Sequence, residues 1–347
     1  MRPVDRRTLL RAGAGALAAV SAPALLAGCG DDEPGPVTRA ITARSIAIDY
    51  ASYYPPVERL RELMSEHAAR RGAHLTFSSD AAGAAAQSAQ FARLTGEQSG
   101  FRVAVVAPFD ATAIDPLAAA AIARGVQIVT YGAPLARTST SAAVATDPAR
   151  SARLLAGHLS AWAGGGGAPD GADVLIVRPP ERSPTPDPFA VRGRPWEAAL
   201  LAELERRAPA LRAVAATTAQ AAADAQAAVA RALEDYPRVR VVLAWNDSAA
   251  AGAAQALRAA TPRARWARLY AGGVGAPAIA TAAALDALRE DPVLRCLVAP
   301  RLRDLANALV DVPYALLRRR PAPAEPPLVV LTKGGRRTLA RFAADYR

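Results

Sequence analysis

Few side chains in this sequence are of the types that carry out covalent chemistry, and their spacing does not assemble a catalytic set. There are three histidines and two cysteines among 347 residues. No Ser-His-Asp order, nucleophile elbow, zinc-binding spacing or paired carboxylates stands out, so we expect no enzyme activity, no cofactor and no metal site. His67 and His158 fall in helical patterns and are interpreted as packing or surface residues. Cys296 lies in an apolar run and is interpreted as a small buried side chain.

The other cysteine, Cys29, lies in a sequence context that is typical of a lipid-accepting thiolate. It follows Leu26-Ala27-Gly28 at the end of an uncharged stretch rich in alanine, glycine and leucine. This segment resembles the lipobox of bacterial lipoproteins, in which small residues admit the chain to a signal peptidase and the thiolate accepts diacylglycerol. Arg6 and Arg7, followed by Thr8-Leu9-Leu10-Arg11, resemble the twin-arginine export signal.

These two signals predict a removed signal peptide over residues 1–28 and a polar, turn-forming tether over residues 29–43. The mature chain is then expected to be an exported, membrane-anchored lipoprotein, in the periplasm or on the outer face of the cytoplasmic membrane. An uncleaved anchor over residues 12–30 is the alternative, because that stretch carries no charge over about the length that spans a bilayer.

The basic charge of the chain does not indicate nucleic-acid binding. The formal net charge is +11, and removal of residues 1–28, with four Arg and one Asp, leaves +8. No run of Lys or Arg is interleaved with aromatic residues, so we expect no nucleic-acid partner.

Short apolar runs alternate with longer amphipathic segments from residue 45 onward. Strands and helices that alternate at these lengths favour right-handed βαβ crossovers and a parallel sheet with helices on both faces. The pattern restarts after residues 134–141, so two similar halves are expected. The expected strands cover residues 45–49, 74–78, 103–107, 127–131, 173–177, 212–216, 239–244, 267–271 and 294–298. The expected helices cover residues 55–71, 84–97, 113–124, 147–163, 192–208, 219–236, 248–260, 276–290 and 302–317, and a late strand covers residues 328–331.

Several segments match a known family in order along nearly the whole mature chain. They are Ile46-Ala47-Ile48-Asp49-Tyr50 with the aromatic pair beyond it, Val103-Ala104-Val105-Val106-Ala107-Pro108, and Val241-Val242-Leu243-Ala244-Trp245-Asn246-Asp247. In the last segment a strand end presents Asn-Asp, and the small residues that follow let the next helix pack closely. The chain thus resembles the type I periplasmic binding proteins, especially their ribose-like, sugar-binding branch.

The resemblance implies an α/β fold of two doubly wound parallel-sheet lobes joined by a three-crossing hinge. The N-terminal lobe would comprise residues 44–143 plus 300–322, and the C-terminal lobe residues 144–299 plus 323–347. Open α/β sheets bind ligands at the carboxyl ends of their strands, so the site would lie between the lobes.

Aromatic faces and hydrogen-bonding groups are what such a cleft needs to bind a small polar ligand without breaking bonds. The resemblance implies Tyr53 and Tyr54 as an aromatic platform and Asn246 with Asp247 as polar contacts, although Asp247 could instead cap the helix beside it. The remaining ligand-binding candidates are Ser52, Asp110, Tyr131, Arg192, Gln220 and Arg301.

Four polar anchors of a ribose-like site are replaced by small or apolar residues. These positions are Ala107, Tyr131-Gly132-Ala133 in place of Asp-Arg, Gly272-Gly273-Val274-Gly275 in place of a loop with Asp, and Pro300 in place of Gln. Unmatched sugar hydroxyls are costly to bury, so a less hydroxylated or partly anionic ligand is favoured over a simple sugar. The glycine run also resembles a dinucleotide loop, but it lacks the full spacing.

The functional expectation is an exported, lipid-anchored solute-binding protein that captures a small polar ligand between its lobes and delivers it to an ABC importer. The ligand would be sugar-like, a polyol, a nucleoside or a small acid, and the partner an ABC permease. The chain is expected to be a monomer tied to the membrane through its lipid. The alternative is a sensory or vestigial binding lipoprotein that acts with a membrane receptor and transports nothing.

Overall fold

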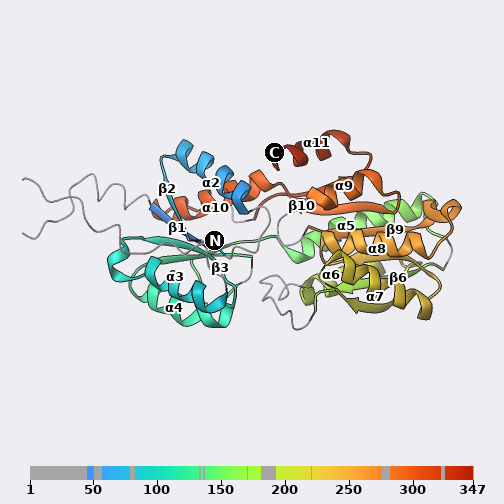
Figure 1. Cartoon of the computed structure of the whole chain (residues 1–347), viewed down its shortest axis with the longest axis horizontal. Helices are drawn as coiled ribbons and strands as arrows, with labels where there is room; N and C mark the ends of the chain where they lie inside the picture. Colours follow the sequence, from blue (N-terminus) through green and yellow to red (C-terminus); the bar gives the residue numbers. More distant parts are fainter. Residues whose placement is uncertain are drawn as a thin grey trace, which may run out of the picture.

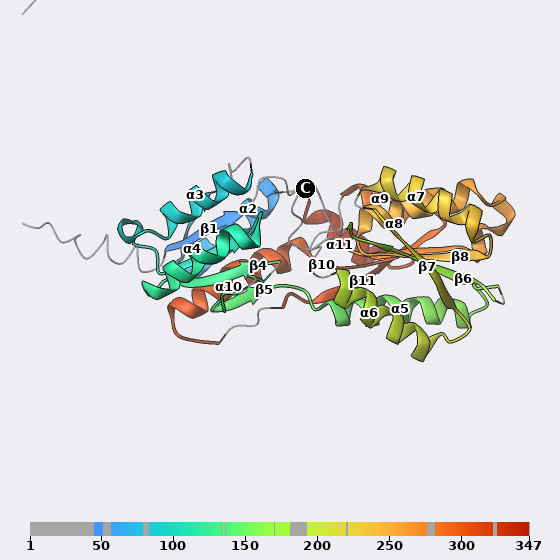
Figure 2. The ribbon, with the colours of Figure 1, turned by 90° about the horizontal axis from the view of Figure 1, so that it is seen from below.

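Two β-sheets organise the chain, and each is covered by helices on both faces (Figure 1). The computed structural model describes residues 45–50, 57–78, 83–132, 134–135, 137–169, 171–180, 193–219, 221–275, 282–321 and 325–346. The two sheets form two lobes that lie end to end, and both views separate them clearly (Figures 1 and 2). The expected two-lobed α/β fold is confirmed.

The first sheet is fully parallel and has the strand order β2-β1-β3-β4-β5. Helices α2 and α10 cover one face, and helices α3 and α4 cover the other. The strands are β1 (Ser45–Tyr50), β2 (His74–Ser78), β3 (Val103–Ala107), β4 (Gln127–Tyr131) and β5 (Ala142–Val144). The helices are α2 (Val57–Arg71), α3 (Ala84–Leu94), the 3-10 turn η1 (Glu97–Ser99), α4 (Ala111–Ala123) and α10 (Leu302–Leu317).

The second sheet has the order β11-β10-β9-β8-β6-β7 and is parallel except for β11, which runs antiparallel to β10. Helices α5 and α6 cover one face, and α7, α8, α9 and α11 cover the other. The strands are β6 (Asp173–Arg178), β7 (Arg212–Thr218), β8 (Val239–Ala244), β9 (Tyr270–Val274), β10 (Leu294–Pro300) and β11 (Leu328–Thr332). The helices are α5 (Pro148–Gly164), α6 (Gly193–Arg207), α7 (Ala222–Asp235), α8 (Asp247–Ala259), η3 (Arg263–Arg268), α9 (Ala282–Glu290) and α11 (Arg336–Ala344).

Burial on both faces explains why the central strands read as unbroken apolar runs. Every residue of β3 is buried. In β1, Ile46 and Ile48 pack toward α2 and α10, whereas Ala47 packs toward α3 and α4. A parallel sheet that is covered on both sides requires this composition, because neither face meets water.

One predicted strand is misplaced by three residues. The expected strand over residues 267–271 is instead η3 followed by β9, so Gly272, Gly273 and Val274 belong to the strand and not to a loop. A Cβ on Gly273 would lie 2.7 Å from the carbonyl oxygen of Asn246 and 2.8 Å from the Cβ of Ala250. The glycines therefore let α8 begin close against β9, and the comparison with a dinucleotide loop is wrong.

Small residues also bring α7 and α8 together, as the sequence predicts. A Cβ on Gly252 of α8 would collide with the carbonyl group of Ala222, which opens α7. Ala249, Ala250 and Ala253 on the same helix are fully buried. The alanine-rich composition of this lobe therefore permits helix axes to approach closely at little side-chain entropy cost.

The chain passes between the two sheets three times, as expected for this fold. It leaves the first sheet after β5, returns at Arg301 to form α10 against the first sheet, and crosses again between α10 and β11. The sequence does not predict α11, the last helix, which packs on the second lobe through Leu339 and Phe342.

Beyond α11, the chain turns back toward the first lobe and is held there by charge. Asp345 is 2% exposed, and its Oδ1 lies 2.9 Å from Nη2 of Arg301 and 3.7 Å from Nε of Arg303. Its backbone oxygen accepts a hydrogen bond of 3.0 Å from Nε of Arg59 on α2. This cluster, Arg59, Arg301, Arg303 and Asp345, connects the end of the second lobe with two helices of the first, and we call it the C-terminal latch.

We expect the Asp345→Asn variant to lose about 3 kcal/mol of unfolding free energy, because it leaves Arg301 with its charge partner removed in a largely buried place. Urea unfolding and the Tm measure this loss. Asp286→Asn is the matched control, since Asp286 is 62% exposed and pairs with Arg289 on the surface. Such surface pairs contribute about 0–1 kcal/mol. Equal losses in the two variants would show that the latch contributes no more than a surface ion pair.

Candidate functional site

Buried polar side chains gather where parallel strands of the two sheets end. Asp49 is the last but one residue of β1, Tyr131 is the last residue of β4, and Asn246 with Asp247 follows β8. All four are at most 6% exposed, and Asp49 and Asp247 are fully buried. Polar groups are costly to bury. Their presence at the carboxyl ends of the parallel strands in both sheets therefore marks these ends as the candidate site.

Tyr346 connects the two halves of this candidate site. It packs against the hydrophobic clusters of both lobes, and the C-terminus lies between the lobes in both views (Figures 1 and 2). Burial raises the pKa of its hydroxyl above the ordinary value, and the nearby Asp247, Asp345 and Tyr131 raise it further. Tyr131 of the first lobe and Asp247 of the second are therefore both close to one phenol group, which places the ends of β4 and β8 around a common point.

Asn246 and Asp247 occupy the start of α8, but with divided roles. The side-chain oxygen of Asn246 accepts a hydrogen bond of 2.6 Å from the backbone N–H of Ala249, so Asn246 is the N-cap. Asp247 is the first helical residue, where a carboxylate is favoured by the positive end of the helix dipole. The expectation that Asp247 could be the capping residue is corrected, because that role belongs to its neighbour.

Asp49 is a buried acid that sequence reasoning did not select. Burial raises its pKa to about 7, although the side chain of Gln87 opposes the shift. Gln87 itself is fully buried on α3 and binds the loop after β3, donating to the Ala107 oxygen at 2.8 Å and accepting from the Phe109 N–H at 2.5 Å. A buried amide thus shapes the loop beside a carboxyl group that is poised to change protonation near neutral pH.

Asp110 and Arg301 both have structural partners in this conformation. The Oδ1 atom of Asp110 accepts hydrogen bonds from Thr112 N at 2.8 Å and Ala113 N at 3.3 Å, which caps α4. Arg301 pairs with Asp345 in the C-terminal latch. A ligand would have to share these side chains or displace their partners, so both stay predictions as ligand contacts.

The structure places only part of the predicted site. Tyr131 is 3% exposed and lies among the apolar side chains under α10, beside Val129 and Val144. The other predicted ligand contacts, the lipidated cysteine and the export signal lie outside the described residues: Ser52, Tyr53, Tyr54, Arg192, Gln220, Cys29, Arg6 and Arg7.

Four residues of the site region escaped sequence reasoning for two different reasons. Asp49 carried a usable signal, because it is the one charged residue in the run Ser45–Tyr50 and stands at its carboxyl end. Gln87 lies in an ordinary helical pattern, and Asp345 and Tyr346 lie in a polar C-terminal segment, so nothing local distinguishes them. Their importance comes from contacts with residues at least 20 positions away.

The chemistry that this arrangement supports is recognition. Among the described residues, no group of His, Cys, Asp and Glu could hold a metal ion. Cys296 is fully buried in β10, and burial raises the pKa of its thiol to about 12, which confirms its interpretation as a packing residue. The carboxylate of Asp247, the amide of Asn246 and the phenols of Tyr131 and Tyr346 can satisfy the polar edge of a small ligand. Within the part of the chain that is described, no helix is long and apolar enough to cross a bilayer.

Comparison with known structures extends the likeness to the whole two-lobed unit. A periplasmic ribose ABC transporter protein from Conexibacter woesei superposes with a TM-score of 0.71 at 17% identity, covering 86% of this chain and 94% of its own. A periplasmic solute-binding protein of an ABC transporter from Actinobacillus succinogenes, with bound D-allose, gives a TM-score of 0.68 at 16% identity over 85% and 99%. The myo-inositol binding protein of Caulobacter gives 0.67 at 18% identity over 87% and 97%.

The match at the level of the sequence family covers the same region. No curated protein matches the sequence significantly. The periplasmic binding protein domain, in contrast, matches residues 50–321, which includes β2 to β10, the first two interlobe crossings and all of α10. Family members of this kind bind solutes and are not enzymes, in agreement with the recognition chemistry of the site. The order of the elements, the two sheets and this match together establish that the chain belongs to the periplasmic binding protein domain family, with the type I fold.

Proposed function

We propose that this protein is an exported, lipid-anchored solute-binding protein that captures a small polar ligand between its lobes and delivers it to an ABC permease. The observation that carries the proposal is the convergence of Tyr131 from the first sheet and Asp247 from the second on Tyr346. A ligand held by both lobes binds the closed arrangement more tightly than the open one, and so shifts the equilibrium toward closure. The three crossings supply the hinge, and a permease would recognise the closed form.

The favoured ligand is a polyol or a sugar derivative with few hydroxyl groups to satisfy, or a small acid. Proteins of the same fold are described with bound D-allose, myo-inositol and glycerol, which are all polyhydroxylated. Asp49, Asn246 and Asp247 can bind hydroxyl groups, whereas Ala107 and Pro300 cannot do so through their side chains. Tyr346 adds a phenol to the region, and its hydroxyl can pair with one polar group of the ligand that would otherwise lack a partner. Tyr53 and Tyr54 remain proposed as the aromatic platform.

Two features of the site also support the alternative of a sensor or a vestigial binding protein. The anchoring positions at Ala107, Gly132 and Pro300 lack polar side chains, and Arg301 is already paired with Asp345. Both features would weaken the binding of a simple sugar. A ligand survey separates this alternative from transport.

A panel of ribose, D-allose, arabinose, myo-inositol, glycerol and small organic acids should contain at least one compound that raises the Tm of the wild type. We expect Asp247→Asn to weaken binding of that compound about tenfold, because a charged hydrogen bond to the ligand is lost. Asp235→Asn, a change on the exposed end of α7, is the control and should bind normally. Absence of any shift across the panel would favour the vestigial alternative.

The pH dependence of stability should reveal Asp49. Its folded-state pKa of about 7 lies above the unfolded value of 3.8, so the folded state binds the proton more tightly. The resulting stabilisation is complete below the unfolded value and is lost as pH rises through the folded value. We expect the unfolding free energy to fall by up to a few kcal/mol across this window, and Asp49→Asn to remove that fall. Urea unfolding at about pH 5 and about pH 8 measures it. Identical pH slopes for variant and wild type would be inconsistent with a raised pKa.

The lipid anchor is tested at Cys29, in cells that express the full chain. Replacement of Cys29 by Ser removes the thiolate that would accept diacylglycerol, so labelling with a radioactive fatty acid should disappear and the protein should leave the membrane fraction. Cys296→Ser is the matched control and should label normally, because that thiol is buried in β10. Continued labelling of the Cys29→Ser protein would refute the lipobox assignment.

A further inference from the structure

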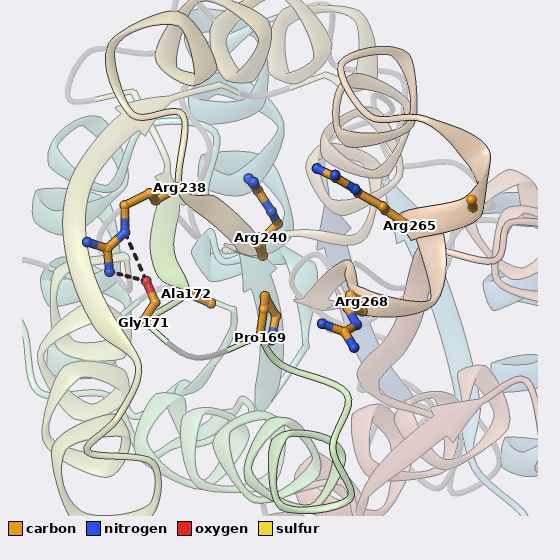
Figure 3. Close-up of a pocket in the computed structure, with 8 residues that line it drawn as sticks. Pro169, Gly171, Ala172, Arg238, Arg240, Arg265 and Arg268 are labelled. Carbon is orange, nitrogen blue, oxygen red and sulfur yellow. Dashed lines mark hydrogen bonds between the residues drawn. The ribbon is translucent and has the colours of Figure 1, made fainter.

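A cavity lies in the C-terminal lobe, at the edge of the sheet opposite to Asn246 and Asp247. Its volume is about 360 Å³. It lies where β6, β8 and β9 begin, and these three strands are neighbours in the sheet. Its lining residues come from the turn before β6, the start of β8 and the turn η3 before β9, and they are Pro169, Gly171, Ala172, Arg238, Arg240, Ala264, Arg265 and Arg268 (Figure 3).

Four of the eight lining residues are arginines, and none of the eight carries a carboxylate. Figure 3 shows the four side chains distributed around one opening, with Arg265 extending toward Arg240 and with Pro169 and Gly171 below. Among the described residues, the carboxylate that pairs with this group is Asp173, whose Oδ2 lies 3.9 Å from Nε of Arg238. Asp173 is shared with Arg212, at 3.8 Å. Within the part of the chain that the structure describes, four lining arginines and one shared carboxylate leave an excess of positive charge.

Two of the arginines are held in place by the backbone. Arg238 donates to the carbonyl oxygen of Gly171 through Nε at 3.1 Å and also through Nη2. Gly171 has a φ of +64°, and a Cβ there would collide with the Arg238 guanidinium, so the glycine is required for this contact. Arg240 donates through Nη1 to the carbonyl oxygens of Pro237 and Val239, both at 2.7 Å. The cavity is thus lined by two arginines that bind backbone carbonyl groups and by Arg265 and Arg268 of η3, and of the four only Arg240 is partly buried.

Helix ends explain only part of this arrangement. The C-terminal end of α7 at Asp235 favours a nearby cation, and Arg238 follows it by three residues. Arg265 and Arg268 belong to η3, are exposed, and line the cavity together with Arg240. Like charges that share a cavity repel each other, and a bound anion relieves that repulsion. Guanidinium groups match phosphate oxygens through paired N–H donors, which a single ammonium group cannot do.

We propose that this cavity binds a phosphate-bearing anion, held by Arg240, Arg265 and Arg268 against the Arg238–Gly171 wall. The site is separate from the interlobe site and does not depend on the solute captured there. Two kinds of ligand carry such a phosphate group, namely a free phosphate compound and the headgroup of an anionic lipid. The shared chemistry is the phosphate group, and the experiment has one arm for each source.

The first arm is calorimetric titration of the full chain with pyrophosphate at constant ionic strength. We expect saturable binding with one site, and a loss of affinity of about tenfold or more in the double variant Arg265→Gln, Arg268→Gln, because two of the paired donors are removed. The matched control is Arg93→Gln, Arg102→Gln, which removes the same charge from exposed positions of the first lobe. The control should bind as the wild type does.

The second arm measures flotation of the full chain with vesicles of phosphatidylcholine, with or without phosphatidylglycerol. A lipid source predicts additional flotation that requires phosphatidylglycerol, is absent in the double variant and is suppressed by pyrophosphate. A free-phosphate source predicts calorimetric binding without that additional flotation. The proposal is overturned if pyrophosphate does not saturate a site and phosphatidylglycerol adds nothing, or if the double variant and the control lose binding equally.

Discussion

The ion pair between Arg301 and Asp345 joins the end of the second lobe to the start of α10 in the first. Arg301 stands at the crossing where the chain leaves β10 and begins α10, and Asp345 follows the last helix of the other lobe. A carboxylate that is only 3% exposed needs a charged partner, and α10 also supplies Arg303 at 3.7 Å. This requirement brings the C-terminal residues back to the hinge. The next residue, Tyr346, is thereby held near both Tyr131 and Asp247, so the composition of the candidate site depends on the latch.

The packing of the second lobe depends on glycines, whose missing side chains let its helices and strands approach closely. Gly252 lets α8 contact the start of α7, and Gly272 and Gly273 let β9 lie against Leu155 and the first turn of α8. These close contacts hold Asn246 and Asp247 at the carboxyl edge of the sheet. Packing at this density tolerates little added volume. The glycines and alanines, which look uninformative in the sequence, therefore determine where Asn246 and Asp247 lie.

The two edges of the second sheet have opposite electrostatic character. At the carboxyl edge the polar groups are the buried amide of Asn246 and carboxylate of Asp247, beside the partly buried phenol of Tyr346, which suits hydroxyl groups or a weakly charged solute. At the amino edge Arg238, Arg240, Arg265 and Arg268 surround a cavity without a lining carboxylate. A parallel sheet allows this division, because loops at its two edges come from different places in the sequence and can be varied independently.

The sequence alone determined the two-lobed α/β fold, because alternating strands and helices of these lengths can bury their apolar faces in few other ways. Nine of the ten expected strands, each read from a local apolar run, coincide with observed strands. The exception, residues 267–271, failed because Gly272 and Gly273 resemble a loop until the helix packed against them is known. The sequence also indicated Asn246 and Asp247, since they end an apolar strand. It could not indicate Gln87, Asp345, Tyr346 or the shared cavity of Arg240, Arg265 and Arg268. Their roles arise from contacts between segments distant along the chain, which only the tertiary structure brings together.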